Sequence, residues 1–497
     1  MLEQVDPFPR RASWILIGAV FLTFLPSLFN GFVRDDALLL LHNPLVESLS
    51  LRSIRQIFTD FQHDFYMPFT FLSFTVERHI FGLNPLVYHT TNLALHAANA
   101  VLVFFILKHV CGRSPEAFLA AVIFALHPMR VESVAWVSER KDVLYAFFYL
   151  GSVWGYLKAS EDKKHYRVVS VLFFIFSLLS KPMMAFTLPL TLVVLDLSLG
   201  AKVGQALKNK SIFIVLAGIA LLVSLGYYQR TSKFSQAANL NGLADSTANL
   251  AHIADAAVFY IQKFLYPVRL STAYPFPGEP GQLFRWHSWV SPMLVFSWVL
   301  TALTGSKKFT FFFFGTTFFL VVMIPPFYIS TKGVLNDRFT YVASIGLSFL
   351  AAKTLFWIKD TRRIGENFWL AGVGFLIACL AIGTWNRCAV WKDDVSYWND
   401  AVQYEPLYPQ PYNGRAMAYL KSGNSNKAME DLNEAIHLNP GFTLAYFSRG
   451  ELYFNRSNYP EAISDLKTAV RLAPYFTPAK DLLIQAQLAE QGAKGVS

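Results

Sequence analysis

Cysteine and charged residues are both scarce in this chain. Its 497 residues include three cysteines, and charged residues make up 15% of the sequence. The thiols of Cys111, Cys379 and Cys388 have neither the spacing of a metal cluster nor that of a disulfide framework, so we expect structural free thiols. With 54% hydrophobic residues, the chain is too apolar for an ordinary soluble protein of this length.

The apolar residues lie in long blocks, which is typical of a polytopic membrane protein. Several blocks are shorter than about 18 residues and would need interfacial flanks to cross a bilayer. We predict an all-α polytopic membrane chain with about eleven spans. The blocks lie near residues 14–30, 91–110, 116–128, 141–158, 167–180, 185–200, 211–228, 288–304, 309–325, 338–357 and 367–386.

Basic residues outnumber acidic ones, and the formal net charge is +10. Much of the excess lies in short loops between apolar blocks, so the positive-inside rule explains it more simply than a nucleic-acid partner, for which we find no signature. The loop charges predict a cytoplasmic N-terminus with an uncleaved first span, and an extracytoplasmic C-terminal region. This topology requires that the segment 251–267 does not cross the membrane. The sequence does not establish whether it crosses.

The C-terminal part of the chain repeats itself. Pro406, Pro440 and Pro474 are 34 residues apart, which is the period of tetratricopeptide repeats. We therefore predict a membrane domain over 1–390 and a repeat domain over 391–497. The stack would bind a protein partner or associate with a second copy. Positions that coincide on this period are Tyr412/Tyr446, Ala416/Gly450, Tyr419/Tyr453, Ala428/Ala462, Leu432/Leu466 and Ala435/Ala469.

Two adjacent acids, Asp35 and Asp36, follow the first apolar block on the predicted outer side. Ionisable groups at a membrane are costly to hold without water, so they commonly mark chemistry or ion binding. A carboxylate in this position could serve as a general base toward an acceptor hydroxyl. The alternative is an interfacial acidic cap. The sequence does not decide which of the two acids would take the proton, although it slightly favours Asp36.

Further candidates lie in other outer turns. Arg338 could hold a phosphate bidentately, and Lys181 follows an apolar run on the same side as the acids. Interfacial anchoring and snorkelling are the alternative roles of these two cations. His89 lies on one helical face with Asn92 and His96, where hydrogen bonds between helices are the expected role. The remaining charged candidates cluster in the segment 126–142 and include His127, Glu132, Glu139, Arg140, Lys141 and Asp142.

Acids and cations on one side of a membrane fit a single chemical scheme. The acid would deprotonate an acceptor hydroxyl, and the cations would stabilise a phosphate leaving group. A donor attached to a lipid phosphate would reach such a site from within the bilayer. The residues therefore predict glycosyl transfer from a lipid carrier. A divalent metal beside the paired acids is possible in chemical terms, but no ligand set commits the sequence to a metal or another cofactor.

The order of these motifs resembles the transmembrane-and-tetratricopeptide O-mannosyltransferases and their bacterial relatives, in the GT-C class of glycosyltransferases. The motifs that carry the resemblance are Asp35-Asp36, His127-Pro-x-x-x-Glu132, Arg140-x-Asp142, Ser180-Lys181-Pro182, Asp337-Arg338-x-x-Tyr341 and the terminal repeats. Two features depart from the family pattern. The repeat array is shorter than in eukaryotic members, and Asp337 stands where a glutamate is more usual.

The resemblance implies an inverting transferase of a bacterial inner membrane that uses a polyprenyl-phosphate-linked sugar and a protein or glycan acceptor. Asp35 or Asp36 would be the catalytic base. Lys181, Arg338 and Arg140 would contact the donor phosphate. The residues that would shape the site are His89, His127, Glu132, Asp142 and Tyr341.

Two other functions compete with the enzyme. A transporter or flippase for a lipid-linked sugar would show charges near the bilayer midplane, whereas the charges here lie at one face. A membrane scaffold that displays the repeats would not need acids and cations in three separate outer turns. The sequence does not identify the sugar, the lipid carrier or the acceptor.

Overall fold

The structure is a computed structural model that describes residues 8–59, 66–161, 165–208, 210–230, 246–272, 274, 310–330 and 335–495. These residues form helices joined by turns, with no strand among them, so the prediction of an all-α chain is confirmed. The predicted apolar block near 288–304 lies outside the described residues. The chain divides into two compact units. The first unit comprises Met1–Leu270 and Tyr274–Lys392, and the repeat unit comprises Ser271–Ala273 and Asp393–Ser497.

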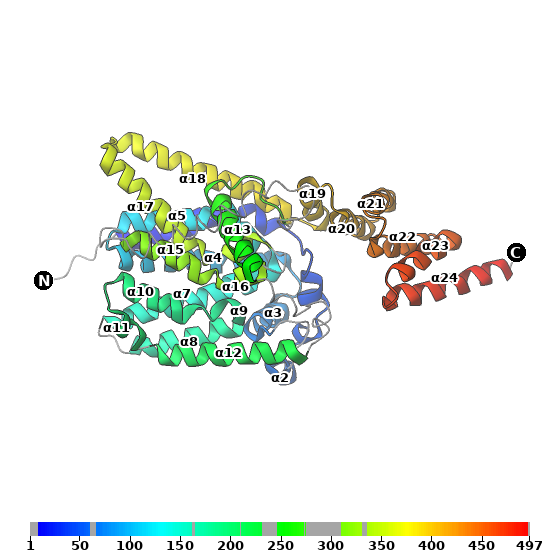
Figure 1. Cartoon of the computed structure of the whole chain (residues 1–497), viewed down its shortest axis with the longest axis horizontal. Coiled ribbons are helices and arrows are strands. Elements are labelled where there is room, and N and C mark those ends of the chain that lie inside the picture. Colours follow the sequence, from blue (N-terminus) through cyan, green and yellow to red (C-terminus); the bar gives the residue numbers. More distant parts are fainter. Residues whose placement is uncertain are drawn as a thin grey trace. The chain divides into compact units, whose positions relative to one another are not determined.

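The first unit is a bundle of apolar helices, and their order along the chain can be followed by colour in Figure 1. Short helices connect the longer ones: α2 (Leu51–Thr59), α6 (Val131–Ala135), α9 (Pro182–Ala185), α11 (Val203–Lys208) and α16 (Ile324–Ser330). The longer helices are α1 (Phe8–Thr23), α3 (Pro68–Phe81), α4 (Pro85–Cys111), α5 (Ser114–Leu126), α7 (Arg140–Ser160), α8 (His165–Ser180), α10 (Leu188–Ser198), α12 (Ser211–Arg230), α13 (Ser246–Leu265), α15 (Thr310–Val322), α17 (Ser344–Arg362) and α18 (Glu366–Cys388).

Two helices in the described part of the chain are long and apolar enough to cross a membrane. They are Pro85–Cys111 and Glu366–Trp391. A third span results if Ser114–Leu126 and Pro128–Ala135, which meet at a bend of 59°, count as one. Length and composition therefore support two or three spans in these residues, and the predicted number of about eleven stays a prediction.

Helix α4 organises the segment on which the predicted site residues lie. It begins where the Asn84 side chain accepts a hydrogen bond from Leu86 N, with Pro85 in the first turn, and it ends at Gly112 in the left-handed conformation. Its buried amides then reach the 134–143 segment. Asn92 Nδ2 donates to Trp136 O at 3.1 Å, and Asn99 Nδ2 donates to Val143 O at 2.9 Å. The first bond satisfies a backbone carbonyl between α6 and the next helical turn, and the second reaches the first turn of α7.

Small residues let neighbouring helices of the first unit approach closely. A Cβ atom at Gly346 of α17 would lie 2.3 Å from Gly315 O of α15, so only glycine fits at that crossing. Between α7 and α8, Ser152 Oγ donates to Ser170 O and Ser170 Oγ donates to Ser152 O, both at 2.7 Å. Helices in an apolar environment associate through such close packing and interhelical hydrogen bonds.

The repeat unit consists of antiparallel helix pairs. Alanines and leucines such as Ala416, Ala428 and Leu432 are fully buried where the helices of a pair meet. Arg415 donates from Nε and Nη2 to the two carboxylate oxygens of Asp431, at 2.8 and 2.7 Å. The same pair recurs 34 residues later as Arg449 and Asp465. The helices are α19 (Asp394–Tyr404), α20 (Pro409–Lys421), α21 (Ser425–Leu438), α22 (Thr443–Asn455), α23 (Tyr459–Leu472) and α24 (Thr477–Gly495).

Candidate active site

The two adjacent acids have different surroundings in the structure. Asp36 is fully buried, and its Oδ2 accepts from Val33 N at 2.8 Å while its Oδ1 accepts from Ser138 N at 2.7 Å and from Ser138 Oγ. Burial raises the pKa of Asp36 to about 7, although these hydrogen bonds oppose the rise. Asp35, by contrast, is exposed. The sequence slightly favoured Asp36 as the acid that meets an acceptor hydroxyl. In the structure, the exposed Asp35 is the more accessible of the two.

The turn that carries the acids, residues 31–36, is joined to the second candidate segment. Besides the two bonds from Ser138 to Asp36, Trp136 Nε1 donates to Val33 O at 3.2 Å. We call residues 31–36 the acid turn. Residues about one hundred positions apart thus meet at this point, and Ser138 and Trp136 are contacts that the sequence reasoning did not single out. Their only signal was their position inside the 126–142 segment.

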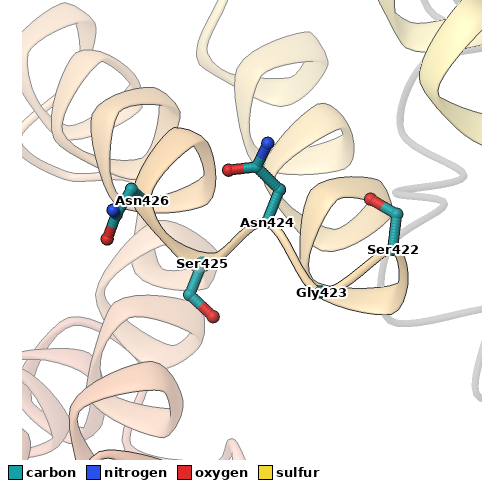
Figure 2. Close-up of a pocket in the computed structure, with 5 residues that line it drawn as sticks. All are labelled: Ser422, Gly423, Asn424, Ser425 and Asn426. Atoms are coloured by element: carbon teal, nitrogen blue, oxygen red, sulfur yellow. The ribbon is translucent and has the colours of Figure 1, made fainter.

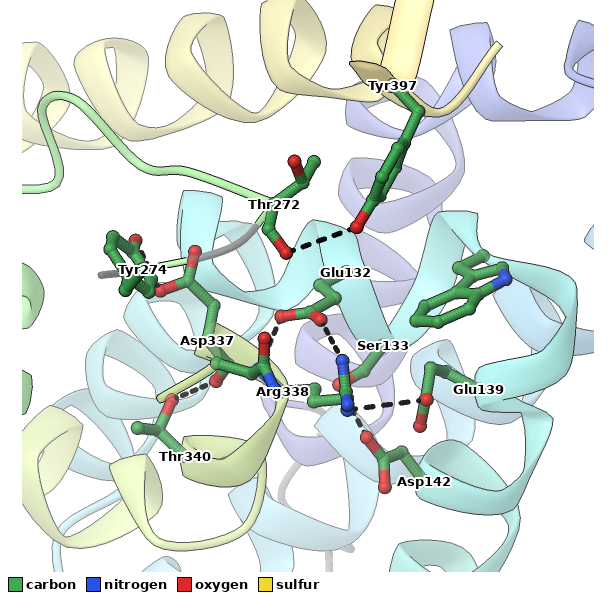
Figure 3. A network of polar contacts seen from close by, with 12 residues as sticks. Glu132, Ser133, Glu139, Asp142, Thr272, Tyr274, Asp337, Arg338, Thr340 and Tyr397 are labelled. Atoms are coloured by element: carbon green, nitrogen blue, oxygen red, sulfur yellow. Dashed lines mark hydrogen bonds and ion pairs between the residues drawn. The ribbon is translucent and has the colours of Figure 1, made fainter. Parts of the chain in front are cut away.

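Next to Ser138 lies a charged cluster of three acids and three cations. Figure 3 shows Arg338 reaching Glu132 and Glu139, with Asp142 close by. The Arg338 guanidinium pairs with Glu132, and its Nε lies 3.4 Å from Glu139 Oε1. Its backbone N–H also donates to Glu132 Oε2 at 2.9 Å. We define the charged cluster as Glu132, Glu139, Lys141, Asp142, Lys181 and Arg338.

The two lysines complete the charged cluster. Lys141 Nζ lies 2.9 Å from Glu139 Oε1, and Lys181 Nζ pairs with Asp142. Ser133 Oγ donates to the other oxygen of Asp142 at 3.1 Å. The acids are almost wholly buried, whereas the side chains of Arg338 and Lys181 are 20% and 13% exposed. Arg338 and Lys181 are therefore the members of this cluster that are most accessible to an outside ligand.

Neighbouring charges favour the charged forms of Glu139 and Arg338 despite their burial. Desolvation alone would raise the pKa of Glu139, but Lys141, Arg338 and Lys181 outweigh it and hold that pKa below its usual range. For Arg338, burial lowers the pKa and the charges of Glu132 and Glu139 raise it above its ordinary value. The indole of Trp136 lies beneath the guanidinium of Arg338, 5.5 Å from its centre. Such fixed charges need little reorganisation when charge develops nearby.

Asp337 occupies a different place from its neighbour Arg338. It is buried, and Tyr274 donates its hydroxyl to Asp337 Oδ1 at 2.9 Å, as Figure 3 shows. Burial raises the pKa of Asp337 to about 7, with a further rise from Glu132. Thr340, in the same turn, accepts a 2.6 Å hydrogen bond from the buried Arg130. These contacts fix the backbone of the turn from which Arg338 projects.

The structure does not bring Arg140 into the charged cluster. Arg140 is fully buried, and its Nη1 and Nη2 donate to the two carboxylate oxygens of Glu77 at 3.0 Å each. It also binds Asn92 and donates to Tyr88 O at 2.9 Å. This arginine ties α7 to α3 and α4, so a direct role in binding a donor phosphate conflicts with its geometry. No sequence motif around Glu77 indicated that it would pair with Arg140.

The other predicted site residues support the backbone around the cluster. His127 Nε2 lies 2.9 Å from Phe264 O, and its Nδ1 accepts from Met129 N at 3.3 Å, so the imidazole is fully used within the chain. His89 Nε2 lies 3.3 Å from Gly31 O in the acid turn. Tyr341 is buried, and its hydroxyl lies 2.6 Å from His96 Nδ1.

The charged cluster holds no candidate metal site in the described residues. No group of three or more histidine, cysteine or acidic side chains there is arranged to hold a metal ion. One hollow lies elsewhere, on the turn between α20 and α21, and is lined by residues 422–426 (Figure 2). Its lining is small and polar, and it shares no residue with the charged cluster.

Comparisons with known proteins find one repeat motif and several similar sequences. A family model described as the tetratricopeptide repeat matches residues 409–442. The chain is 26% identical over 422 residues to the protein O-mannosyl-transferase F38B6.6 of Caenorhabditis elegans, covering 80% of this chain and 58% of that protein. Human protein O-mannosyl-transferase TMTC1 is 33% identical over 170 residues, which is 31% of this chain and 19% of that protein. The chain is thus similar to protein O-mannosyl-transferases of the TMTC type, in agreement with the resemblance of its sequence motifs.

These matches cover parts of the relatives. The chain spans about 58% of the length of the C. elegans relative. The solved oligosaccharyltransferase of Archaeoglobus fulgidus covers 79% of this chain and 57% of its own at 16% identity, with a TM-score of 0.38. That likeness is too slight to support an argument about the fold.

Proposed function

We propose that this TMTC-like protein is an integral membrane glycosyltransferase. It moves a sugar from a polyprenyl-phosphate-linked donor to a hydroxyl of a protein acceptor, with inversion at the anomeric carbon. The observation that carries the proposal is the joining of the acid turn to the charged cluster through Ser138 and Trp136. The names of the relatives suggest mannose as the sugar to test first.

In the proposed reaction, an acceptor oxygen attacks the anomeric carbon of the sugar. Asp35 takes the hydroxyl proton, since it is exposed next to the buried Asp36. The bond between the anomeric carbon and the phosphate oxygen breaks, and the polyprenyl phosphate leaves with the electron pair. Asp36 acts as a positioning residue, because its three hydrogen bonds hold the acid turn against residue 138.

The leaving phosphate gains negative charge and requires cations nearby. Arg338 and Lys181 are the partly exposed members of the charged cluster, and we assign them to the donor phosphate. Glu132, Glu139 and Asp142 hold these cations in place in the absence of donor. Arg140 takes no part in this contact in the proposal, because Glu77 occupies both of its terminal nitrogens.

The proposal also includes the membrane arrangement. The domain 1–390 crosses a bacterial inner membrane about eleven times as a GT-C-type helical domain, with a cytoplasmic N-terminus. The acid turn, the charged cluster and the repeat domain 391–497 lie on the periplasmic side. The repeats bind the protein acceptor or a second copy of the chain. Apolar helices and the positive loops support this arrangement.

The test uses membrane vesicles that contain the full chain, a polyprenyl-phosphate mannose with labelled sugar, and periplasmic proteins as acceptors. We expect labelled protein with the wild type, a loss of about 1,000-fold with Asp35→Asn, and no loss with the exposed control Asp360→Asn. Full activity in Asp35→Asn, Asp36→Asn and the double variant would remove the catalytic role of the pair. Movement of the donor across the bilayer without sugar transfer would instead favour the flippase.

A further inference from the structure

The end of α18 and the residues just after it are hydrogen-bonded to the beginning of the acid turn. Asn30, just before the turn, donates from Nδ2 to Cys388 O at 3.0 Å, and Gly31 N donates to Lys392 O at 2.9 Å. Residues 388 and 392 therefore hold the beginning of the acid turn from a point more than 350 positions later in the sequence. All of these residues belong to the first unit, and Lys392 is its last residue before the chain enters the repeat unit.

Trp391 lies between these two attachments. It is one of the largest fully buried side chains of the chain, and its indole stacks on that of Trp136 with ring centroids 5.1 Å apart and planes inclined by 23°. Trp136 in turn donates to Val33 O in the acid turn and lies beneath the cations of Arg338 and Lys141. Trp391 thus supports a side chain that contacts both the acid turn and the charged cluster.

We infer that Trp391 is a positioning residue for the transfer reaction, acting through Trp136 on the acid turn and on Arg338. The inference rests on the proposed function. Stacked aromatic rings contribute stabilisation beyond the area that they bury, and offset stacking fixes the position of both rings. Loss of the Trp391 ring frees Trp136 to move. The hydrogen bond to Val33 and the support of the Arg338 guanidinium then weaken together.

The first experiment measures hydrogen exchange by mass spectrometry in the full-length protein in detergent, without any substrate. In Trp391→Ala we expect faster exchange in peptides that cover 31–40 and 132–142, and unchanged exchange in peptides that cover 425–472. Trp391→Phe keeps a stacking ring and should restore wild-type exchange. Trp385→Ala, which removes an exposed indole from α18 just before Trp391, is the matched control and should change neither region.

The second experiment measures transfer kinetics with the same variants. Misplacement of reacting groups by about 1 Å can lower a rate by about 100-fold, so Trp391→Ala should lose kcat on that scale while KM for the donor changes far less. Trp391→Phe should recover most of kcat. A variant that had merely unfolded would instead lose protection throughout the first unit.

The outcomes separate this inference from the proposed function. Unchanged exchange over 31–40 in Trp391→Ala overturns the inference, whatever the activity. Increased exchange there with wild-type kcat also overturns it. A wild-type protein without transferase activity is the failure of the proposed function itself, and it is visible before any variant is made.

Discussion

Arginine–carboxylate pairs stabilise both units of this protein, but they are built in opposite ways. In the repeat unit, Arg415 reaches Asp431 only 16 positions further along the chain, and the pair recurs with the repeat period. In the first unit, Arg338 pairs with Glu132 across 206 positions, and Arg140 pairs with Glu77 across 63. The repeat pairs are partly exposed, whereas Arg140 is wholly buried.

This difference separates two uses of charge. A local, partly solvated pair stabilises a helix hairpin by a modest amount, and its repetition makes it tolerant of loss. Burying an ion pair between distant segments costs desolvation free energy. Removal of one partner then leaves an uncompensated buried charge, which lowers the free energy of unfolding. We therefore expect loss of a partner of the buried Arg140 to cost the first unit more stability than loss of a pair costs the repeat unit. The predictions below test this contrast.

The largest effect is expected where a fully buried partner is removed. Glu77→Gln leaves the Arg140 guanidinium buried beside a neutral side chain, which should lower the free energy of unfolding of the first unit by about 3–5 kcal/mol. Denaturant titration of the full chain in mixed micelles, followed by hydrogen exchange in α3 and α4, measures this loss. The matched control is Glu47→Gln, because Glu47 is exposed and lies 3.9 Å from Arg78. Equal stability of the two variants would contradict the contrast.

Burial of Asp36 predicts a dependence of stability on pH. Its pKa is raised from an ordinary value of 3.8 to about 7, with burial as the main cause. Well below pH 3.8 the carboxyl is protonated whether the chain is folded or not. Between pH 4 and pH 7 the unfolded chain releases the proton first, so the contribution of Asp36 to stability falls as pH rises, by on the order of 4 kcal/mol in total.

Asp36→Asn removes this titration, so the stability difference between wild type and variant should change across that pH window and level off above pH 7. Thermal melting in detergent at pH 4 to 8 measures the difference. The exposed Asp360→Asn should show a constant difference from wild type over the same range. A constant difference for Asp36→Asn as well would mean that the carboxyl is not buried as described.

The sequence predicted the helical class, the repeats and the family, because these depend on local signals. The proline period of 34 residues and the paired alanines specify the repeats without any knowledge of distant contacts. Apolar blocks likewise predicted positions close to those of α4, α7, α8 and α18. The number of spans could not be settled in this way, since several of the apolar helices are shorter than a bilayer requires.

The pairing of charges in the site could not be predicted. The sequence placed Glu132, Arg140, Lys181 and Arg338 in outer turns, but it could not say which of them would meet. Adjacent residues in the 139–142 stretch point to different neighbours: Lys141 meets Glu139, whereas Arg140 turns to Glu77. Helical geometry sends successive side chains about 100° apart, so partner choice depends on tertiary packing. The same reason separates the buried Asp36 from the exposed Asp35.

Arg338 tests whether the charged cluster has a chemical role in addition to a structural one. In Arg338→Ala we expect a loss of about 100-fold in transfer, equivalent to about 2.7 kcal/mol of transition-state stabilisation. Arg338→Lys keeps the positive charge but not the paired donors of the planar guanidinium, so it should recover part of the lost transfer activity. Arg363→Ala, an exposed arginine after α17, is the control. Equal loss of stability and of activity in Arg338→Ala would reduce its role to structure alone.

The smallest effect is expected in the repeat unit. Arg449→Ala removes a bidentate pair whose arginine side chain is 20% exposed, and water can solvate the remaining Asp465 after local relaxation. The loss should be about 1 kcal/mol, measured by hydrogen exchange in α22 and α23 of the full chain. A double-mutant cycle with Asp465→Ala isolates the coupling energy from the separate effects of each side chain. A coupling as large as that between Glu77 and Arg140 would show that a short sequence separation does not make a charge pair dispensable, and the contrast between the two units would fail.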